Sequence, residues 1–236
     1  MHERETAISV KNLKKMYGGK IAVNGIHLNV KMGEIFSLLG PNGAGKTTIV
    51  EILEGHRKKT SGDVDVLGFD PGLNQQDFKK RVGIVLQSTS VEPYLTVRET
   101  IELFSGYYDN PFPSEQVMDI TGILDIADSK VRKLSGGQQR RLDVAIGLSG
   151  NPELLFLDEP TTGFDPLARR SSWELVNNLK SLGKTVFLTT HYMDEAEHCE
   201  RIAVIDQGKI VAIDTSEKLK DSLGGDLVSL RTPNNE

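Results

Sequence analysis

The run Gly40-Pro41-Asn42-Gly43-Ala44-Gly45-Lys46-Thr47 has the residue types and the spacing of a phosphate-binding loop. Glycines let the backbone close around phosphate oxygens where a Cβ would obstruct them, and successive N–H groups form a nest for an anion. Lys46 offers a positive charge to the β- and γ-phosphates, and Thr47 offers a hydroxyl to Mg²⁺. A chance match in a glycine-rich turn has odds of about one in a hundred for a chain of this length. The loop therefore predicts a nucleotide bound with Mg²⁺.

Two carboxylates follow an apolar run further along the chain. Asp158 and Glu159 come directly after Leu154-Leu155-Phe156-Leu157, which reads as a buried strand. In phosphate-loop enzymes an aspartate at such a strand end helps to hold Mg²⁺, and a neighbouring glutamate can accept a hydrogen bond from the attacking water. On its own the pair is equally compatible with the polar start of a loop. The upstream loop favours the catalytic interpretation.

A second glycine motif, Leu134-Ser135-Gly136-Gly137-Gln138, precedes a predicted helix that starts at Gln139. Because the N-terminus of a helix attracts anions, the motif predicts a second phosphate site. One nucleotide has little use for two such sites in the same subunit.

The elements around these motifs alternate between strands and helices. A strand at 34–39 and a helix at 47–53 flank the first loop, and Gly55 stands where a helix C-terminal glycine belongs. Other strands are predicted at 26–30, 63–66, 82–86, 154–157 and 185–189. Residues 202–205 and 210–213 are predicted to form a hairpin around Gln207-Gly208. A helix is predicted at 166–182, with Leu175, Leu179 and Leu182 on one face.

Between Ser88 and Gly147 no strand-like run occurs. Thr96 and Glu99 have the spacing of a capping box, which predicts a helix start. We interpret this stretch as a helical insert in the core.

Composition limits the possible roles. The chain has 236 residues and a formal net charge of −5, which argues against non-specific binding of nucleic acid. Its single cysteine, Cys199, excludes an intrachain disulfide and suits the cytosol. No apolar run approaches the roughly 20 residues that span a bilayer, so a membrane role is expected to be peripheral and through a partner.

Taken together, the motifs resemble the nucleotide-binding domain of ABC transporters, and the resemblance covers essentially the whole chain. It implies an α/β fold with a P-loop NTPase core, a mixed sheet, an N-terminal antiparallel β subdomain and a helical subdomain. A single domain over 1–236 would place the core in 1–87 and 148–236 and the helical subdomain in 88–147.

The resemblance also implies a role for each matched residue. Tyr17 is placed like the aromatic that stacks on adenine, Gln87 like the glutamine that links to the membrane partner, and His191 like the histidine that contacts the γ-phosphate. Catalytic roles are implied for Lys46, Gln87, Glu159 and His191, and Mg²⁺ contacts for Thr47, Gln87 and Asp158. Nucleotide contacts are implied for Tyr17, Gly40, Pro41, Asn42, Gly43, Ala44, Gly45, Lys46, Thr47, Thr48, Ser135, Gly136, Gly137, Gln138 and Asp165. Phe164 departs from the leucine that is usual before this aspartate, and this larger side chain is expected to alter the packing between the two subunits.

The run Leu134–Gln138 resembles the signature motif of this family. In this family two subunits clamp two ATP molecules head to tail, and the signature motif of each subunit faces the partner's nucleotide. The resemblance thus implies an ATP hydrolase that uses ATP and Mg²⁺. Its partners would be a second ATPase subunit, in a homodimer, and a transmembrane permease at the cytoplasmic face of a prokaryotic membrane, with no nucleic acid.

The stretches 159–163 and 188–197 are similar to ATPase subunits of bacterial drug-resistance, Na⁺ and polysaccharide exporters. Two alternatives stay open, namely an importer subunit and a non-transport ATPase of DNA repair or translation. The second is disfavoured because a long coiled coil and a second cassette are both missing.

Overall fold

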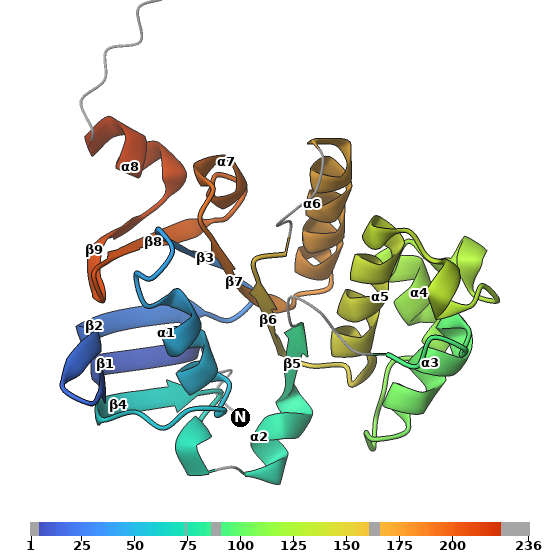
Figure 1. The fold of residues 1–236 in the computed structure, drawn as a ribbon, viewed down its shortest axis with the longest axis horizontal. Helices are drawn as coiled ribbons and strands as arrows, with labels where there is room; N and C mark the ends of the chain where they lie inside the picture. The colour runs from blue at the N-terminus through green and yellow to red at the C-terminus, as the bar shows by residue number, and fades with distance from the viewer. Residues whose placement is uncertain (1–4, 74, 86–90, 161–165, 223–236) are drawn as a thin grey trace, which may run out of the picture.

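The computed structural model describes residues 5–73, 75–85, 91–160 and 166–222, with the side chains of 166–172 left out. Its central sheet has six strands in the order β5-β6-β7-β3-β8-β9 (Figure 1). The strands are β3 (Ile35–Leu39), β5 (Val82–Val85), β6 (Leu154–Asp158), β7 (Thr185–Thr190), β8 (Arg201–Asp206) and β9 (Lys209–Asp214). All neighbours are parallel except β8 and β9, which form the expected hairpin. The carboxyl ends of β3, β6 and β7 therefore meet at one edge.

A second, antiparallel sheet has the order β2-β1-β4, with β1 (Thr6–Tyr17), β2 (Lys20–Lys31) and β4 (Ser61–Val66). The helix α1 (Lys46–Leu53) lies between the two sheets and buries Ile49 and Leu53. Those side chains share one apolar cluster with Phe36 and Phe156 of the central sheet. The predicted fold class, a P-loop core of the ABC-ATPase type with an antiparallel β subdomain, is confirmed.

The other face of the central sheet is covered by α5 (Gly136–Ser149), α6 (Pro166–Ser181) and the short α7 (Met193–Ala196) (Figure 1). On α6, Leu175 and Leu179 are buried as expected, but Leu182 is 39% exposed. The helix was predicted to end one residue too late, at Leu182, because it ends at Ser181 and Gly183 takes a left-handed φ of 71°. The helices α2 (Gln76–Arg81) and α8 (Ser216–Ser222) lie at the periphery.

Helices fill the described residues between β5 and β6. They are α3 (Val97–Ser105), α4 (Ser114–Thr121) and α5, with 3₁₀ turns at Leu124–Ile126 and Val131–Lys133. Thr96 and Glu99 form the capping box that the sequence predicted. These helices bury a cluster of their own, which includes Ile101, Val117 and Leu142.

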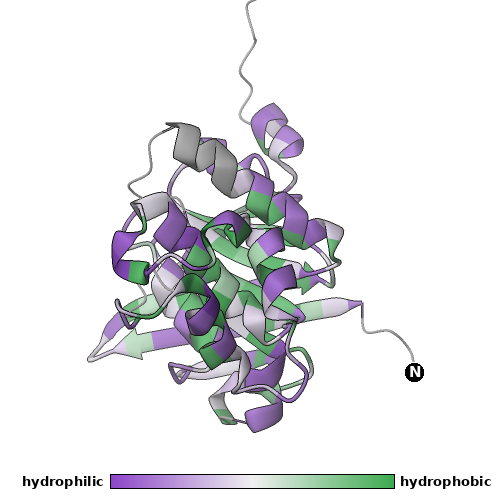
Figure 2. Ribbon diagram, turned by 90° about the vertical axis from the view of Figure 1, so that its right-hand side faces the viewer, coloured by the Kyte–Doolittle hydropathy of each residue, from purple (hydrophilic) through white to green (hydrophobic). Residues whose placement is uncertain are grey.

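Apolar residues gather inside the layers and polar residues cover the outside (Figure 2). Among the described residues, no helix combines the length and the apolar character that crossing a membrane requires.

Candidate functional site

The phosphate-binding loop joins β3 to α1, as its sequence predicted. Lys46, which is 5% exposed, donates from Nζ to the carbonyls of Gly40 at 2.8 Å and Pro41 at 3.3 Å. Gly45 has a φ of 109°, and a Cβ at that position would lie 2.7 Å from the Ala22 carbonyl oxygen. Glycine is therefore required there both by the backbone conformation and by the close approach of β2.

A cavity of about 600 Å³ opens above this loop. Of the residues predicted to contact nucleotide or carry out catalysis, its lining includes Tyr17, Asn42, Gly43, Gly45, Lys46, Thr47, Thr48 and Glu159. Residues that the sequence analysis did not assign also line it: Lys20, Ile21, Ala22, Gln207 and Gly208. The last two are the hairpin turn, and the Gly208 N–H donates to the Ala44 carbonyl at 2.9 Å. The turn after β8 thus supports the phosphate-binding loop. The contact follows from the sheet order, in which β8 lies beside β3, and could not be inferred from a local motif.

Tyr17 is 39% exposed at the end of β1, as expected for a ring that receives a base rather than one in the core. The guanidinium of Arg57 lies 5.3 Å from the ring centroid, and Lys15 Nζ lies 5.0 Å from it. Arg57 also pairs with Glu51 of α1. The interaction with Glu51 is the leading cause that raises the Arg57 pKa, and the same ion pair holds the guanidinium near the Tyr17 ring.

Glu159 follows β6 in a left-handed conformation, with a φ of 44°. This conformation is uncommon for residues other than glycine and costs about 1–3 kcal/mol. The Glu159 N–H donates to Thr189 Oγ1 at 3.0 Å, and the same hydroxyl donates to Asp158 Oδ1 at 2.5 Å. Thr189, on the neighbouring strand β7, therefore holds both carboxylate residues in place. The sequence analysis did not assign it.

The Glu159 carboxylate meets two other predicted catalytic residues. Its Oε1 lies 3.6 Å from Lys46 Nζ and 3.4 Å from His191 Nδ1. The three side chains are 14%, 5% and 25% exposed, so the contacts are largely shielded from water. A carboxylate, an ammonium and an imidazole within this distance can together bind a phosphate and move a proton.

The segment after β7 positions His191. The Thr190 hydroxyl donates to Glu195 Oε2 at 2.5 Å and accepts from the Tyr192 N–H at 3.0 Å. The rings of His191 and Tyr192 pack with centroids 3.9 Å apart. This places the imidazole at the edge where the carboxyl ends of β6 and β7 meet.

The signature residues lie apart from this cavity. Ser135 caps α5, accepting from the Gln138 N–H at 3.3 Å, while Gln138 Oε1 accepts from the Ser135 N–H at 2.9 Å. The helix thus begins at Gly136, two residues after Leu134 and earlier than predicted. Ser-x-x-Gln is itself a capping-box signal that the sequence analysis did not use. Ser135 and Gly136 are exposed, and an added Cβ on Gly136 or Gly137 would meet nothing within 4 Å.

Arg140 connects the signature helix to the catalytic strand. It is buried and donates to the carbonyls of Asp158 and Pro160, both at 3.2 Å, on either side of Glu159. Burial lowers its pKa, while Asp143 and Asp158 raise it. Gln87, Phe164 and Asp165, which were also singled out from the sequence, lie outside the described residues.

Relatives with assigned roles match most of the chain. The Nod factor export ATP-binding protein I of Burkholderia orbicola is 39% identical over 233 residues, which cover 96% of this chain and 77% of the relative. The linearmycin resistance ATP-binding protein LnrL of Bacillus subtilis is 39% identical, over 94% of this chain and 73% of the relative. The daunorubicin/doxorubicin resistance protein DrrA of Streptomyces peucetius is 38% identical, over 95% and 70%.

Solved structures give the same result. The cassette cbiO1 of Clostridium perfringens, part of the transporter complex cbiONQ, superposes with a TM-score of 0.83 at 26% identity, over 93% of this chain and 92% of its own. The bacterial cassette MJ0796, solved as a dimer, has a TM-score of 0.76 at 29% identity, over 89% and 98%. The family model described as "ABC transporter" matches residues 23–162. The chain therefore belongs to the ABC transporter family, as an ATP-binding subunit that hydrolyses ATP.

Proposed function

We propose that two copies of this chain bind two ATP molecules head to tail and hydrolyse them to drive export through a separate membrane permease. One observation carries the ATPase part of this proposal. A single cavity gathers Tyr17, the phosphate-binding loop and Glu159, with Glu159 Oε1 within 3.6 Å of Lys46 and 3.4 Å of His191. These groups suffice to hold a base, a triphosphate and an attacking water.

In this proposal each residue has one task. Tyr17 stacks on adenine, and the backbone from Gly40 to Thr48 holds the phosphates. Lys46 exchanges its contact with Glu159 for a contact with the γ-phosphate, which frees the carboxylate to accept a proton from water. His191, which lies 3.4 Å from the same carboxylate, contacts the γ-phosphate and stabilises its developing charge.

The residues present fit a Mg²⁺ ion. Thr47 lines the cavity, and the Asp158 carboxylate is fixed by Thr189 at 2.5 Å. The described residues contain no cluster of three or more His, Cys, Asp or Glu that could hold a metal. A hydroxyl and one carboxylate, completed by phosphate oxygens and water, form the usual sparse Mg²⁺ site of nucleotide enzymes. Bound there, Mg²⁺ would neutralise phosphate charge, with Gln87 as a further ligand.

The signature motif supplies the argument for a homodimer. Ser135 and Gly136 are exposed at the N-terminus of a 14-residue helix, and neither lines the nucleotide cavity of its own chain. A helix N-terminus with exposed N–H groups suits the γ-phosphate of a second copy. Asp165 would contact the same interface between the two copies.

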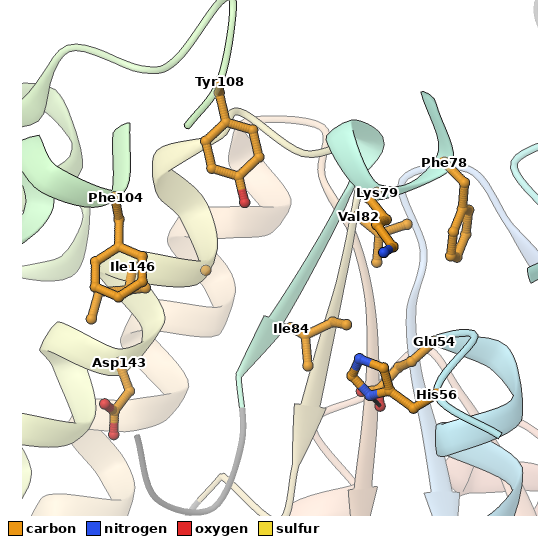
Figure 3. Close-up of a pocket in the computed structure, with 11 residues that line it drawn as sticks. Glu54, His56, Phe78, Lys79, Val82, Ile84, Phe104, Tyr108, Asp143 and Ile146 are labelled. Atoms are coloured by element: carbon orange, nitrogen blue, oxygen red, sulfur yellow. Dashed lines mark ion pairs between the residues drawn. The ribbon is translucent and has the colours of Figure 1, made fainter. Parts of the chain in front are cut away.

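A groove between the core and the helices is proposed to receive the permease. Its volume is about 400 Å³, and Figure 3 shows Val82 and Ile84 on one side facing Phe104, Tyr108 and Ile146 on the other. Such a concave apolar surface suits a short helix of a partner. We propose that residues 88–147 act as the helical subdomain, moving with the permease, and that the subunit is held at the cytoplasmic face of a prokaryotic membrane by this contact.

Export is the proposed direction because the relatives above are named for export and drug resistance. The test is co-expression with a permease encoded beside the gene, followed by transport in inverted membrane vesicles with a panel that includes daunorubicin and linearmycin. Mg-ATP should drive uptake by inverted vesicles, and Glu159→Gln should abolish it. ATP-driven uptake confined to right-side-out vesicles supplied with internal ATP would indicate an importer and contradict the proposal.

A further inference from the structure

The groove in Figure 3 contains a carboxylate that the ATPase site does not use. Glu54 directly follows α1, and its side chain is 4% exposed although it lines the groove. A carboxylate at this depth is costly unless a cation or several N–H groups compensate for its lost hydration. The charged groups around Glu54 therefore determine which partner side chains the groove can bind.

The compensation within the described part of the chain is weak. The ion pair of Glu54 is with His56 Nδ1 at 3.4 Å, and the His56 side chain is 57% exposed. Burial, with Asp158 and Glu51 as nearby negative charges, raises the pKa of Glu54 to about 8. The carboxyl thus lies in a site that disfavours its own charge and would favour a cation brought from outside.

The opposite wall of the groove carries a second acidic residue. Asp143 on α5 is 5% exposed, with Oδ2 at 4.0 Å from Arg140 of the same helix. Arg140 does not itself line the groove, and the lysine that does, Lys79 of α2, is exposed. The interior of the groove is therefore apolar with acidic groups on both walls, and Arg140 already neutralises one of them.

We propose that the permease segment that enters this groove places a lysine or arginine side chain against Glu54, while its apolar side chains pack on Ile84, Phe104 and Ile146. The inference rests on the proposed docking of a permease in the groove. Charge complementarity selects this occupant, because a cation against Glu54 would stabilise the charged form of its carboxyl group, whereas a wholly apolar segment would gain nothing from it and an acidic segment would be repelled. The ion pair would tie the end of the phosphate-loop helix α1 directly to the membrane partner.

The experiment uses the complete chain co-expressed with the permease encoded beside it, purified from membranes in detergent. Glu54→Gln and Glu54→Arg are compared with Glu102→Gln, which makes the same charge change on the exposed face of α3. Losing one partner of a buried charge pair should weaken the complex at least about tenfold for Glu54→Gln and more for Glu54→Arg, with no change for Glu102→Gln. In the Glu54→Arg background, each lysine and arginine of the cytoplasmic permease loops is then changed to glutamate, and one change should restore the complex.

Two readouts separate the possible failures. Cysteine crosslinking from Tyr108→Cys to the permease reports docking in the groove independently of charge, and the thermal midpoint of each variant reports folding. If crosslinking succeeds but both Glu54 variants bind like the native chain, or no charge reversal restores Glu54→Arg, the ion pair is refuted and the docking stands. If the native chain neither co-purifies nor crosslinks, both the docking and this inference are overturned.

Discussion

The carboxylate oxygen Oε1 of Glu159 lies 3.6 Å from Nζ of Lys46. The residue expected to activate water is thus in contact with the residue expected to bind the γ-phosphate. A phosphate that binds Lys46 competes for this contact. Nucleotide binding is therefore expected to release the Glu159 carboxylate, which can then act as the general base.

Glu159→Gln should nearly abolish ATP turnover while preserving ATP binding. Loss of a positioned general base typically lowers the rate by about 10²–10⁴-fold. The amide keeps the size of the side chain but cannot accept the proton, so the ATP-bound dimer should accumulate. Size-exclusion chromatography with ATP and steady-state phosphate release measure the two effects. Hydrolysis at the native rate would rule out this role for Glu159.

Thr189→Val should lower kcat, with little change in ATP affinity. The hydroxyl holds Asp158 at 2.5 Å and the Glu159 N–H at 3.0 Å, so its loss leaves both carboxylate residues misplaced. Loss of a residue that orients a ligand or base commonly costs about 10–100-fold. Thr189→Ser keeps the hydroxyl and should restore most of kcat. Equal rates for the valine and serine variants would mean that the hydroxyl has no positioning role.

Arg57 should strengthen adenine binding by fixing Tyr17, although it has no place in the sequence motifs. Tyr17→Ala removes a stacking surface worth about 1–3 kcal/mol and should weaken ATP binding by about tenfold or more. Arg57→Met removes the cation beside the ring and should weaken ATP binding by a few fold, in line with a cation–π energy of about 0.5–1 kcal/mol. Calorimetry with ATP and with inorganic triphosphate separates base from phosphate binding. Equal losses for the two ligands would contradict the assignment.

Glu54 should make folding stability depend on pH. Its folded pKa is raised from 4.5 to about 8, so the folded state holds a proton that the unfolded chain releases. The stabilisation is complete below about pH 4.5 and is lost as the pH rises toward about 8. Glu54→Gln should flatten this part of the profile and leave the variant more stable than the native chain at pH 8.5. Urea unfolding in EDTA at several pH values measures this, and parallel profiles for the two proteins would refute it.

Local motifs predicted the phosphate loop, the capped helix at Val97 and the hairpin at Gln207-Gly208, because each is determined by a few adjacent residues. The role of Thr189 could not be predicted, since it depends on the register that pairs it with Asp158 across β6 and β7. The same holds for Arg57, which reaches Tyr17 only because α1 returns the chain toward β1. The end of α6 was predicted one residue too late for a local reason, because the apolar spacing continues to Leu182, past the helix end that Gly183 imposes.

The central claim is that each ATPase site is built from two chains. Mixing two inactive variants tests it most directly. Lys46→Ala disables the phosphate loop, and Ser135→Asp keeps a good N-cap while it repels phosphate. A mixed dimer would contain one fully native site, so an equimolar mixture should regain about a quarter of native ATPase activity if subunits exchange freely. If each variant retains activity by itself, or if the mixture stays as inactive as its components after verified subunit exchange, the two-chain site is contradicted.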